Sequence, residues 1–136
     1  MAEKSRIEIT KKDVLYRGKT LDYMKTLDVR ESTKFLPSRS RRTILRNFNT
    51  IENFIKRCEK KISLNKRIRT HKRDIVIVPK LVGLTIAIHS GKIFQDVIIL
   101  PEMIGHRLGE FVATRSKVNH GAAGIGATKG SRALKK

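Results

Sequence analysis

Residues 75–100 read IVIVPKLVGLTIAIHSGKIFQDVIIL, and this stretch decides the predicted fold. The β-branched run at 75–78 ends at Pro79 and is typical of a strand, and residues 84–88 form a second such run. Residues 93–100 supply a third strand. The tetrapeptide HSGK at 89–92 predicts a hairpin turn between the last two, because its glycine can take a positive φ. The stretch therefore predicts a small three-stranded, mostly antiparallel sheet.

Short helices are predicted before this sheet. Residues 21–27 carry apolar side chains at roughly helical spacing after Thr20, a candidate N-cap. Asp28 followed by Glu31 fits a capping pattern for another short helical turn. Pro37 then interrupts, because it cannot donate a backbone hydrogen bond.

Two longer helices follow Pro37. Ser38 is expected to cap a short, very basic helix, and residues 47–49 read as a break. Thr50 begins the clearest helix in the chain, which has one apolar face. The side chains expected on that face are Ile51, Phe54, Ile55, Cys58 and Ile62.

The chain ends differ from this central part. Pro101 opens a short helical turn that runs through Leu108. Residues 112–136 are rich in glycine, small side chains and basic residues, with too little apolar surface to fold alone. The predicted organisation is an extended segment at 1–19, a single α+β domain at 20–111 and a basic, flexible tail at 112–136.

Charge is the dominant feature of the composition. The net charge is +19 over 136 residues, and residues 39–73 hold thirteen Lys or Arg against two Asp or Glu, a net of +11. Self-repulsion at this charge favours a polyanionic partner. A membrane is the weaker candidate, because Trp is absent and no apolar run approaches the ~18–20 residues of a membrane span. Nucleic acid is the favoured partner.

The predicted compartment is the cytoplasm. The first residues, MAEKSR, contain no apolar stretch of the signal-peptide type. Cys58 is the single cysteine, so an internal disulfide is excluded. Both features indicate a reducing, intracellular setting.

Two arginine clusters are the strongest local signal for phosphate binding. The first is RSRRTILR at 39–46 and the second is RIRTHKR at 67–73. Arginine presents a planar fork that binds phosphate through two hydrogen bonds and can stack on a base. No helix-turn-helix, zinc-finger or basic-zipper pattern occurs, and no aromatic pair of the RRM type stands on a strand. The clusters therefore favour RNA, contacted mainly through backbone and shape.

Catalysis, metal and cofactor binding are not predicted. The four histidines are far apart in sequence, whereas a zinc site needs about four converging ligands. The glycine-rich segment at 121–131 lacks the Gly-Lys-Ser/Thr order and the preceding strand of a phosphate loop. His71 and His106 are candidates for hydrogen bonds to RNA or for a structural role, and these two alternatives stay open.

Several motifs together resemble a known family. They are PKLVG at 79–83, IHSGK at 88–92, EMIGHRLGEF at 102–111, Thr114-Arg115 and His120. The chain resembles the S-nineteen family of small-subunit ribosomal proteins, and GHRLGEF at 105–111 is the most specific piece. The segments LPSRSRR at 36–42, THKRD at 70–74 and GIGAT at 124–128 are similar to the archaeal and eukaryotic branch. The match covers about residues 16–132.

The resemblance implies a structural, non-enzymatic role in the head of the small ribosomal subunit. It implies binding to the subunit's ribosomal RNA, a neighbouring protein of the S-thirteen family, and a C-terminal tail that reaches toward the decoding region and its tRNAs. No homo-oligomer is expected. Lys80 and Leu81 stand where Glu and Met are usual in the family. Lys80 adds either a phosphate contact or an altered protein contact, and the residues do not decide which.

The predicted rRNA-binding set combines the arginine clusters with basic residues of the motifs and the tail. It consists of Arg39, Arg41, Arg42, Arg46, Arg67, Arg69, His71, Lys72, Arg73, Lys80, Lys92, His106, Arg107, Arg115, Lys117, His120, Lys129 and Arg132. Two other classes are weighed against a ribosomal scaffold: a nucleic-acid-binding or chaperone module acting off the ribosome, and an RNA-processing enzyme. The lack of a recognisable carboxylate, histidine or metal cluster counts against the enzyme.

Overall fold

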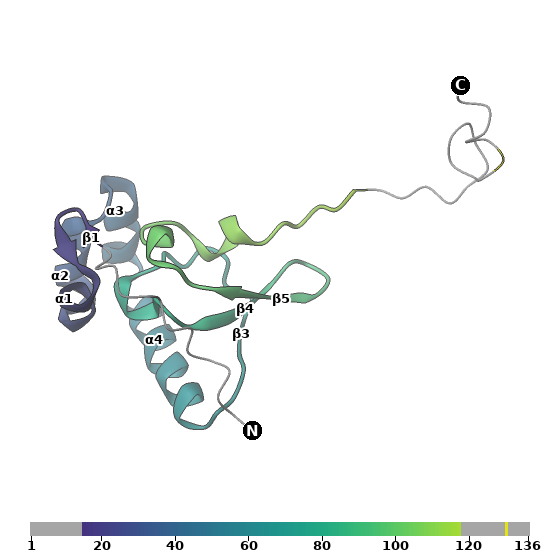
Figure 1. Cartoon of the computed structure of the whole chain (residues 1–136), viewed down its shortest axis with the longest axis horizontal. Helices are drawn as coiled ribbons and strands as arrows, with labels where there is room; N and C mark the ends of the chain where they lie inside the picture. The colour runs from purple at the N-terminus through teal and green to yellow at the C-terminus, as the bar shows by residue number, and fades with distance from the viewer. Residues whose placement is uncertain (1–14, 118–129, 131–136) are drawn as a thin grey trace.

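The computed structural model describes residues 15–117 and Gly130, and its α+β class agrees with the prediction (Figure 1). Helices α1 to α3 gather at one end of the molecule, and α4 runs beside the main sheet. The helices are α1 (Leu21–Thr26), α2 (Val29–Ser32), α3 (Ser38–Arg46) and α4 (Phe48–Ser63). The strands are β1 (Leu15–Tyr16), β2 (Lys19–Thr20), β3 (Ile68–Thr70), β4 (Thr85–His89) and β5 (Phe94–Ile98). Short 3-10 turns occur at Thr33–Phe35, Pro79–Leu81, Pro101–Met103 and Leu108–Phe111.

The main sheet has the strand order β3-β4-β5. Strands β4 and β5 form the predicted antiparallel hairpin, with His89 opposite Phe94 and a φ of +105° at Gly91. Strand β3 runs parallel to β4. Parallel strands need a long crossover connection, and residues 71–84 supply it here. The prediction of a mostly antiparallel sheet is therefore wrong: one strand pair is parallel and one antiparallel.

The strand predicted at 75–78 is not part of this sheet. These four residues are at most 2% exposed, but they pair with residues 105–108. The N–H of Ile77 donates to the carbonyl of His106 (2.8 Å), and the N–H of Leu108 donates to that of Ile75 (3.0 Å). Val76 and Arg107 form an isolated antiparallel bridge. The apolar run thus marks a buried, extended segment whose partner is the GHRLGEF segment.

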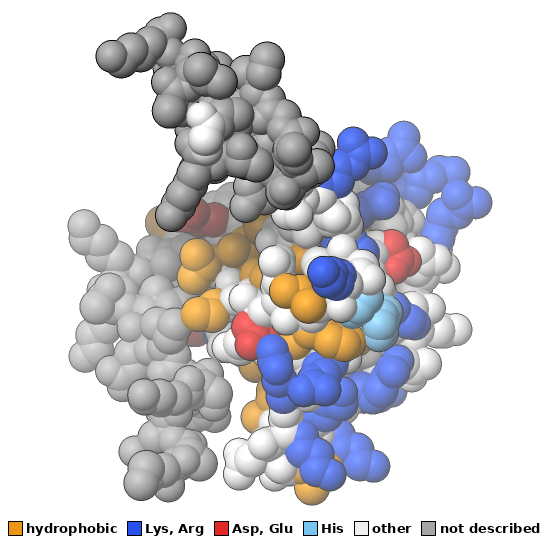
Figure 2. All heavy atoms as spheres, turned by 90° about the vertical axis from the view of Figure 1, so that its right-hand side faces the viewer, with side chains coloured by type: hydrophobic (Ala, Val, Ile, Leu, Met, Phe, Trp, Pro, Cys, Tyr) orange, Lys and Arg blue, Asp and Glu red, His pale blue; other side chains and the backbone are white. Residues whose placement is uncertain are grey.

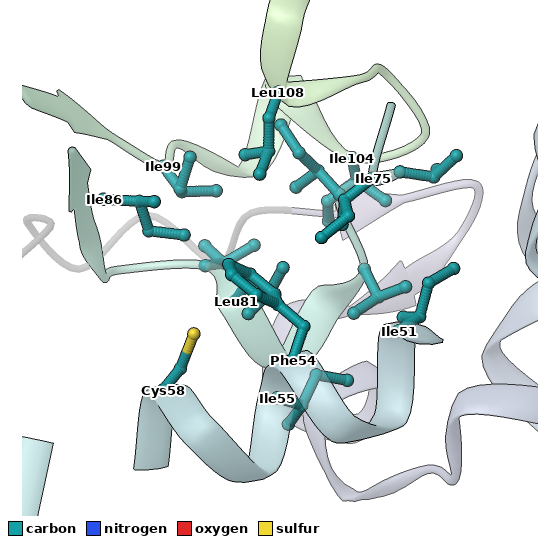
Figure 3. Packing of buried hydrophobic residues seen from close by; sticks show 14 of the residues in the cluster. Ile51, Phe54, Ile55, Cys58, Ile75, Leu81, Ile86, Ile99, Ile104 and Leu108 are labelled. Carbon is teal, nitrogen blue, oxygen red and sulfur yellow. The ribbon is translucent and has the colours of Figure 1, made fainter. Parts of the chain in front are cut away.

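The hydrophobic core lies between α4 and the main sheet (Figure 3). Phe54, Ile55 and Cys58 of α4 are at most 5% exposed, as the helical pattern predicts. Ile62 is 41% exposed, so its assignment to the buried face is wrong. The helix has passed the end of the sheet by this turn, which is also visible in Figure 1. The break before α4 is shorter than predicted, because only Asn47 separates it from α3.

The first helices follow the predicted pattern, except that one N-cap lies a residue earlier than predicted. Thr20 is the N-cap residue of α1 and Asp28 that of α2, where the backbone N–H of Asp28 donates to the Glu31 carboxylate (3.4 Å). The N-cap of α3 is Pro37, and the predicted cap Ser38 is the first helical residue. A proline is well suited to a helix start because its missing N–H has no helical partner there.

Structured residues also lie just outside the range 20–111 of the predicted domain. Residues 15–20, which include the end of the segment expected to be extended, form the β1–β2 hairpin. Tyr16 of this hairpin packs against the core. At the other end, Val112 is 2% exposed and belongs to the core. The chain then leaves the domain, and residues 113–117 are exposed (Figure 1). The predicted flexibility of the remaining tail concerns residues outside the described part of the chain.

Candidate nucleic-acid interface

The GHRLGEF segment is docked on the protein through its two glycines. A Cβ on Gly109 would lie 3.0 Å from both the Cβ and the carbonyl oxygen of Arg73, so only glycine fits without a shift. The N–H of Gly109 donates to that same carbonyl (2.9 Å). Gly105 has a φ of +88°, a conformation that L side chains rarely adopt. The segment therefore follows the core closely and turns its polar side chains outward.

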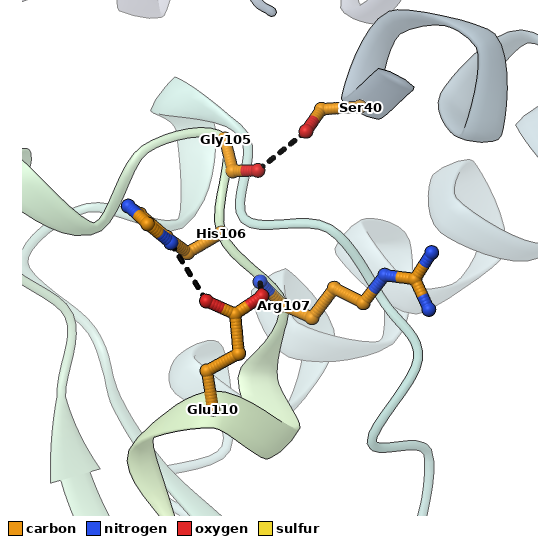
Figure 4. A network of polar contacts seen from close by, with 5 residues as sticks. All are labelled: Ser40, Gly105, His106, Arg107 and Glu110. Carbon is orange, nitrogen blue, oxygen red and sulfur yellow. Dashed lines mark hydrogen bonds and ion pairs between the residues drawn. The ribbon is translucent and has the colours of Figure 1, made fainter.

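Helix α3 is joined to the same segment. The hydroxyl of Ser40 donates to the carbonyl of Gly105 (2.6 Å), as Figure 4 shows. A Cβ on Gly105 would also lie 3.2 Å from Pro37, just before the helix. The basic helix and the segment that carries His106 and Arg107 are thus held side by side.

The arginines of α3 are all exposed. Ile44 is the buried residue of this helix, at 0% exposure, and Ser40 and Thr43 are half-buried beside it. The arginines occupy the remaining faces: Arg39, Arg41, Arg42 and Arg46. Because one buried isoleucine fixes the helix to the core, the guanidinium groups lie free of the protein interior and can contact phosphate.

A hydrogen-bonded turn fixes His106 beside Glu110. One carboxylate oxygen of Glu110 accepts from the backbone N–H of Arg107 (3.0 Å), and the other lies 2.7 Å from Nδ1 of His106 (Figure 4). The Arg107 N–H bond, followed by the His106 side chain, lowers the pKa of the Glu110 carboxyl from its ordinary value. The carboxylate stays ionised and orients the imidazole, while the Arg107 side chain is exposed.

Two predicted contact residues already bind partners within this chain. The guanidinium of Arg73 donates to the backbone carbonyls of His89 (2.8 Å), Gly109 (2.8 Å) and Val112 (2.6 Å). The guanidinium of Arg67 pairs with both carboxylate oxygens of Asp96 (3.0 and 2.6 Å). These bonds occupy much of the donor capacity of Arg73, which makes it chiefly a brace between three segments.

The rest of the predicted set lies at the surface wherever the structure describes it. Lys80 is half-buried in the turn Pro79–Leu81, and Lys92 is exposed in the β4–β5 turn. The other exposed members are Arg69, His71, Lys72, His106, Arg107, Arg115 and Lys117. His120, Lys129 and Arg132 lie outside the described residues. In Figure 2, Lys and Arg side chains cover much of the face where the β4–β5 hairpin ends.

Sequence reasoning left two basic residues of α4 out of this set. Arg57 and Lys61 line a groove of about 260 Å³ together with Arg69 and Lys72, between α4 and β3. Their spacing of four residues places them on one side of the helix, next to the apolar face. That spacing was a usable signal, but the strand that completes the groove was not predicted.

Acidic partners are few in the described part of the chain. The ion pairs found within residues 15–117 are Lys56–Glu52, Arg67–Asp96 and His106–Glu110. Most of the lysines and arginines there consequently carry charge that no carboxylate of this chain neutralises. This is the electrostatic footprint of a protein that binds a polyanion.

Comparison with known proteins decides the family. Residues 42–120 match the family described as Ribosomal protein S19. The chain is also 45% identical over 131 residues to a protein of Methanocella arvoryzae, covering 93% of this chain and 89% of that protein. A protein of Halorubrum lacusprofundi is 44% identical over 125 residues, with 89% of each chain covered. Both relatives are named small ribosomal subunit protein uS19. The chain belongs to the ribosomal protein S19 family.

Membership in this family confirms the predicted resemblance. The matched region begins in α3 and includes the docked GHRLGEF segment, while the two relatives extend the similarity over most of the chain. The S19 family is one of structural ribosomal proteins, so the prediction that this chain is not an enzyme is confirmed as well.

The described residues contain no further chemical site of a familiar kind. Among them, no three His, Cys, Asp or Glu side chains lie together as metal ligands. No described helix is long and apolar enough to cross a membrane. Burial raises the pKa of the Cys58 thiol to about 11, which leaves it protonated and unreactive at neutral pH.

Proposed function

We propose that this chain is a structural protein of the small ribosomal subunit that binds the subunit's RNA in its head. Its family and its relatives' names support the subunit assignment. The observation that carries the RNA-binding role is the joint exposure of the arginines of α3 and of His106 and Arg107 on the adjoining GHRLGEF segment, which Ser40 and Gly105 hold next to that helix.

Binding would rest mainly on phosphate contacts. The exposed arginines of α3 offer forked donors at the protein surface, and those donors match two phosphate oxygens at once. His106 and Arg107 extend the same surface. Helices of folded RNA would be held together because one rigid domain neutralises several backbone segments. Arg73 and Arg67 would contribute indirectly. Their hydrogen bonds to His89 and Asp96 fix the segments on which other basic residues of this surface stand.

The finer parts of the proposal concern neighbours and place. The resemblance implies contact with a protein of the S-thirteen family, a tail near the decoding region and its tRNAs, and residence on cytoplasmic ribosomes. Arg115 and Lys117 are exposed where the chain leaves the domain, so the start of the tail can already contact RNA. Homo-oligomer formation forms no part of this role.

Sedimentation of the tagged full-length chain from cell extract tests the proposal. The chain is expected to co-migrate with small subunits and whole ribosomes through a sucrose gradient, and to stay there after a high-salt wash. A variant with Arg39, Arg41, Arg42 and Arg46 changed to Gln should dissociate in the wash, because it loses the proposed phosphate contacts. It should still fold, since these exposed side chains add little to folding. If the unmodified chain stays at the top of the gradient, it acts off the ribosome and the proposal fails.

A further inference from the structure

Three aromatic rings form a compact triangular cluster at one end of the main sheet, in which Phe94 meets both histidines edge to face. The ring centroids of His71 and His89 are 4.4 Å apart, those of His89 and Phe94 are 4.8 Å apart, and those of His71 and Phe94 are 5.0 Å apart. The cluster follows from strand register. His89 is opposite Phe94 in the β4–β5 hairpin, and His71 directly follows Thr70, which is opposite Ile88.

The rings lie on the face of the sheet turned away from the core. Ile86 and Ile88 alternate with Ala87 and His89 along β4, and the two isoleucines are fully buried in the core cluster. His71 is exposed, and His89 and Phe94 are half-buried. Figure 2, which looks at the side of the molecule where the β4–β5 hairpin ends, shows histidine beside hydrophobic side chains there, with Lys and Arg nearby. These aromatic rings are therefore accessible from solvent.

Local hydrogen bonds hold the two histidines in place. The hydroxyl of Thr70 accepts from the N–H of Lys72 (3.1 Å), which fixes the turn that carries His71. The guanidinium of Arg73 donates to the carbonyl of His89 (2.8 Å). The N–H of Gly91 donates to Nδ1 of His89 (3.1 Å), so the neutral ring carries its proton on Nε2 and can donate from there.

Positive charge surrounds the rings on the side of β3. The guanidinium of Arg69 lies over the Phe94 ring, 5.7 Å from its centroid. Arg69 and His71 also line the groove between α4 and β3. Its other lining residues are the basic Arg57, Lys61 and Lys72 together with Phe54, Cys58, Ile68 and Thr70, and none of them is a carboxylate. An anion in this groove would be adjacent to the aromatic cluster, because His71 belongs to both. One nucleotide can therefore engage both features, with its phosphate in the groove and its base on the rings.

We propose that the aromatic cluster of His71, His89 and Phe94 is a stacking platform for an unpaired base of RNA, which stacks on an exposed ring face of the cluster, with the phosphate next to that base held in the groove beside β3. This inference rests on the proposed function and adds to it a contact with a base. Stacking on aromatic rings is tolerant of base identity, because every base presents a π-face. A paired base inside a helix cannot reach the rings, so the platform selects a bulged or looped nucleotide.

Two hairpin RNAs that differ by a single bulged 2-aminopurine test the platform against the full-length chain. The unaltered protein should prefer the bulged hairpin about tenfold, and the 2-aminopurine fluorescence should fall on binding because the base stacks. Phe94→Leu should remove most of this preference and leave binding to the unbulged hairpin unchanged. His71→Gln should also remove most of the preference, and it should weaken binding to both hairpins because His71 lines the groove as well. Phe94→Tyr keeps the ring and should restore the preference.

Phosphate binding and base stacking separate in this experiment. Lys72→Gln should weaken binding to both hairpins equally and reduce the salt slope by about one. Equal affinity of the unaltered chain for both hairpins, or full preference in Phe94→Leu and His71→Gln, would overturn the platform while leaving the ribosomal role in place. Failure to bind either hairpin at low salt would overturn RNA binding by this surface altogether, together with the platform.

Discussion

At the scale of single residues, Gly109 is the position where the backbone leaves no room for a side chain. Gly109→Ala would place a Cβ 3.0 Å from the backbone carbonyl of Arg73, and backbone cannot move aside as a flexible side chain can. The expected loss of folding free energy is about 1–3 kcal/mol, measured by urea denaturation. Gly130→Ala is the control, because nothing lies within 4 Å of its added Cβ. Equal stability of the two variants would contradict the packing argument.

Glu110 is a single residue that makes the stability of the folded chain depend on pH. Its pKa is lowered from 4.5 in the folded chain, first of all by the N–H of Arg107. A lowered pKa means that the ionised carboxylate stabilises the fold above the unfolded value, and that this contribution is lost as the pH falls through the folded pKa. The unmodified chain should therefore lose stability relative to Glu110→Gln as the pH falls below about 4.5. Parallel stability curves from pH 7 to pH 3 would show that the turn makes no such contribution.

At the scale of elements, Arg73 connects the crossover after β3 to the end of β4 and to the start of the tail. Arg73→Lys keeps the charge but cannot reach three carbonyls with one planar fork. The free energy of unfolding should fall by about 1.5–3 kcal/mol or more, since hydrogen bonds from a charged donor are strong. Thermal unfolding would measure it, and Arg42→Lys on exposed α3 should change stability little. If instead Arg73→Lys folds normally and binds RNA weakly, Arg73 is a contact residue and not a brace.

The elements also show what sequence patterns can and cannot predict. The hairpin β4–β5 and the buried face of α4 follow from local periodicity and a glycine turn, so both were predictable. Strand β3 was not, because it is three residues long and its middle residue is Arg69. The run at 75–78 was assigned to the sheet because apolar, β-branched residues look alike in any buried extended segment. Which segment pairs with it depends on tertiary contacts with residues 105–108, and no local pattern encodes that choice.

The candidate site also has residues whose role the sequence predicts and residues whose role it does not. Charge clustering identified the exposed arginines of α3, because a basic helix with one buried isoleucine has nowhere else to place them. It could not show that Arg73 donates into the protein, since a guanidinium can bind carbonyls and phosphates equally well. The aromatic cluster could not be predicted from the sequence either. His71, His89 and Phe94 come from three strand ends, and they meet only through the register of both strand pairs.

At the scale of the whole molecule, a net charge of +19 raises the question of whether RNA affinity follows total charge or the arrangement of charges. If about 6–10 phosphates are neutralised, affinity for small-subunit RNA should fall by ~10³–10⁵ between 50 and 200 mM salt. The double variant Arg41→Gln/Arg42→Gln should reduce the slope of log affinity against log salt by about two, because each arginine releases about one counterion. Lys25→Gln/Lys34→Gln removes the same charge from α1 and the turn Thr33–Phe35, outside the proposed surface, and should leave the slope nearly unchanged. An equal change in both double variants would mean that net charge alone sets the affinity, and that the docking of α3 on the GHRLGEF segment has no part in recognition.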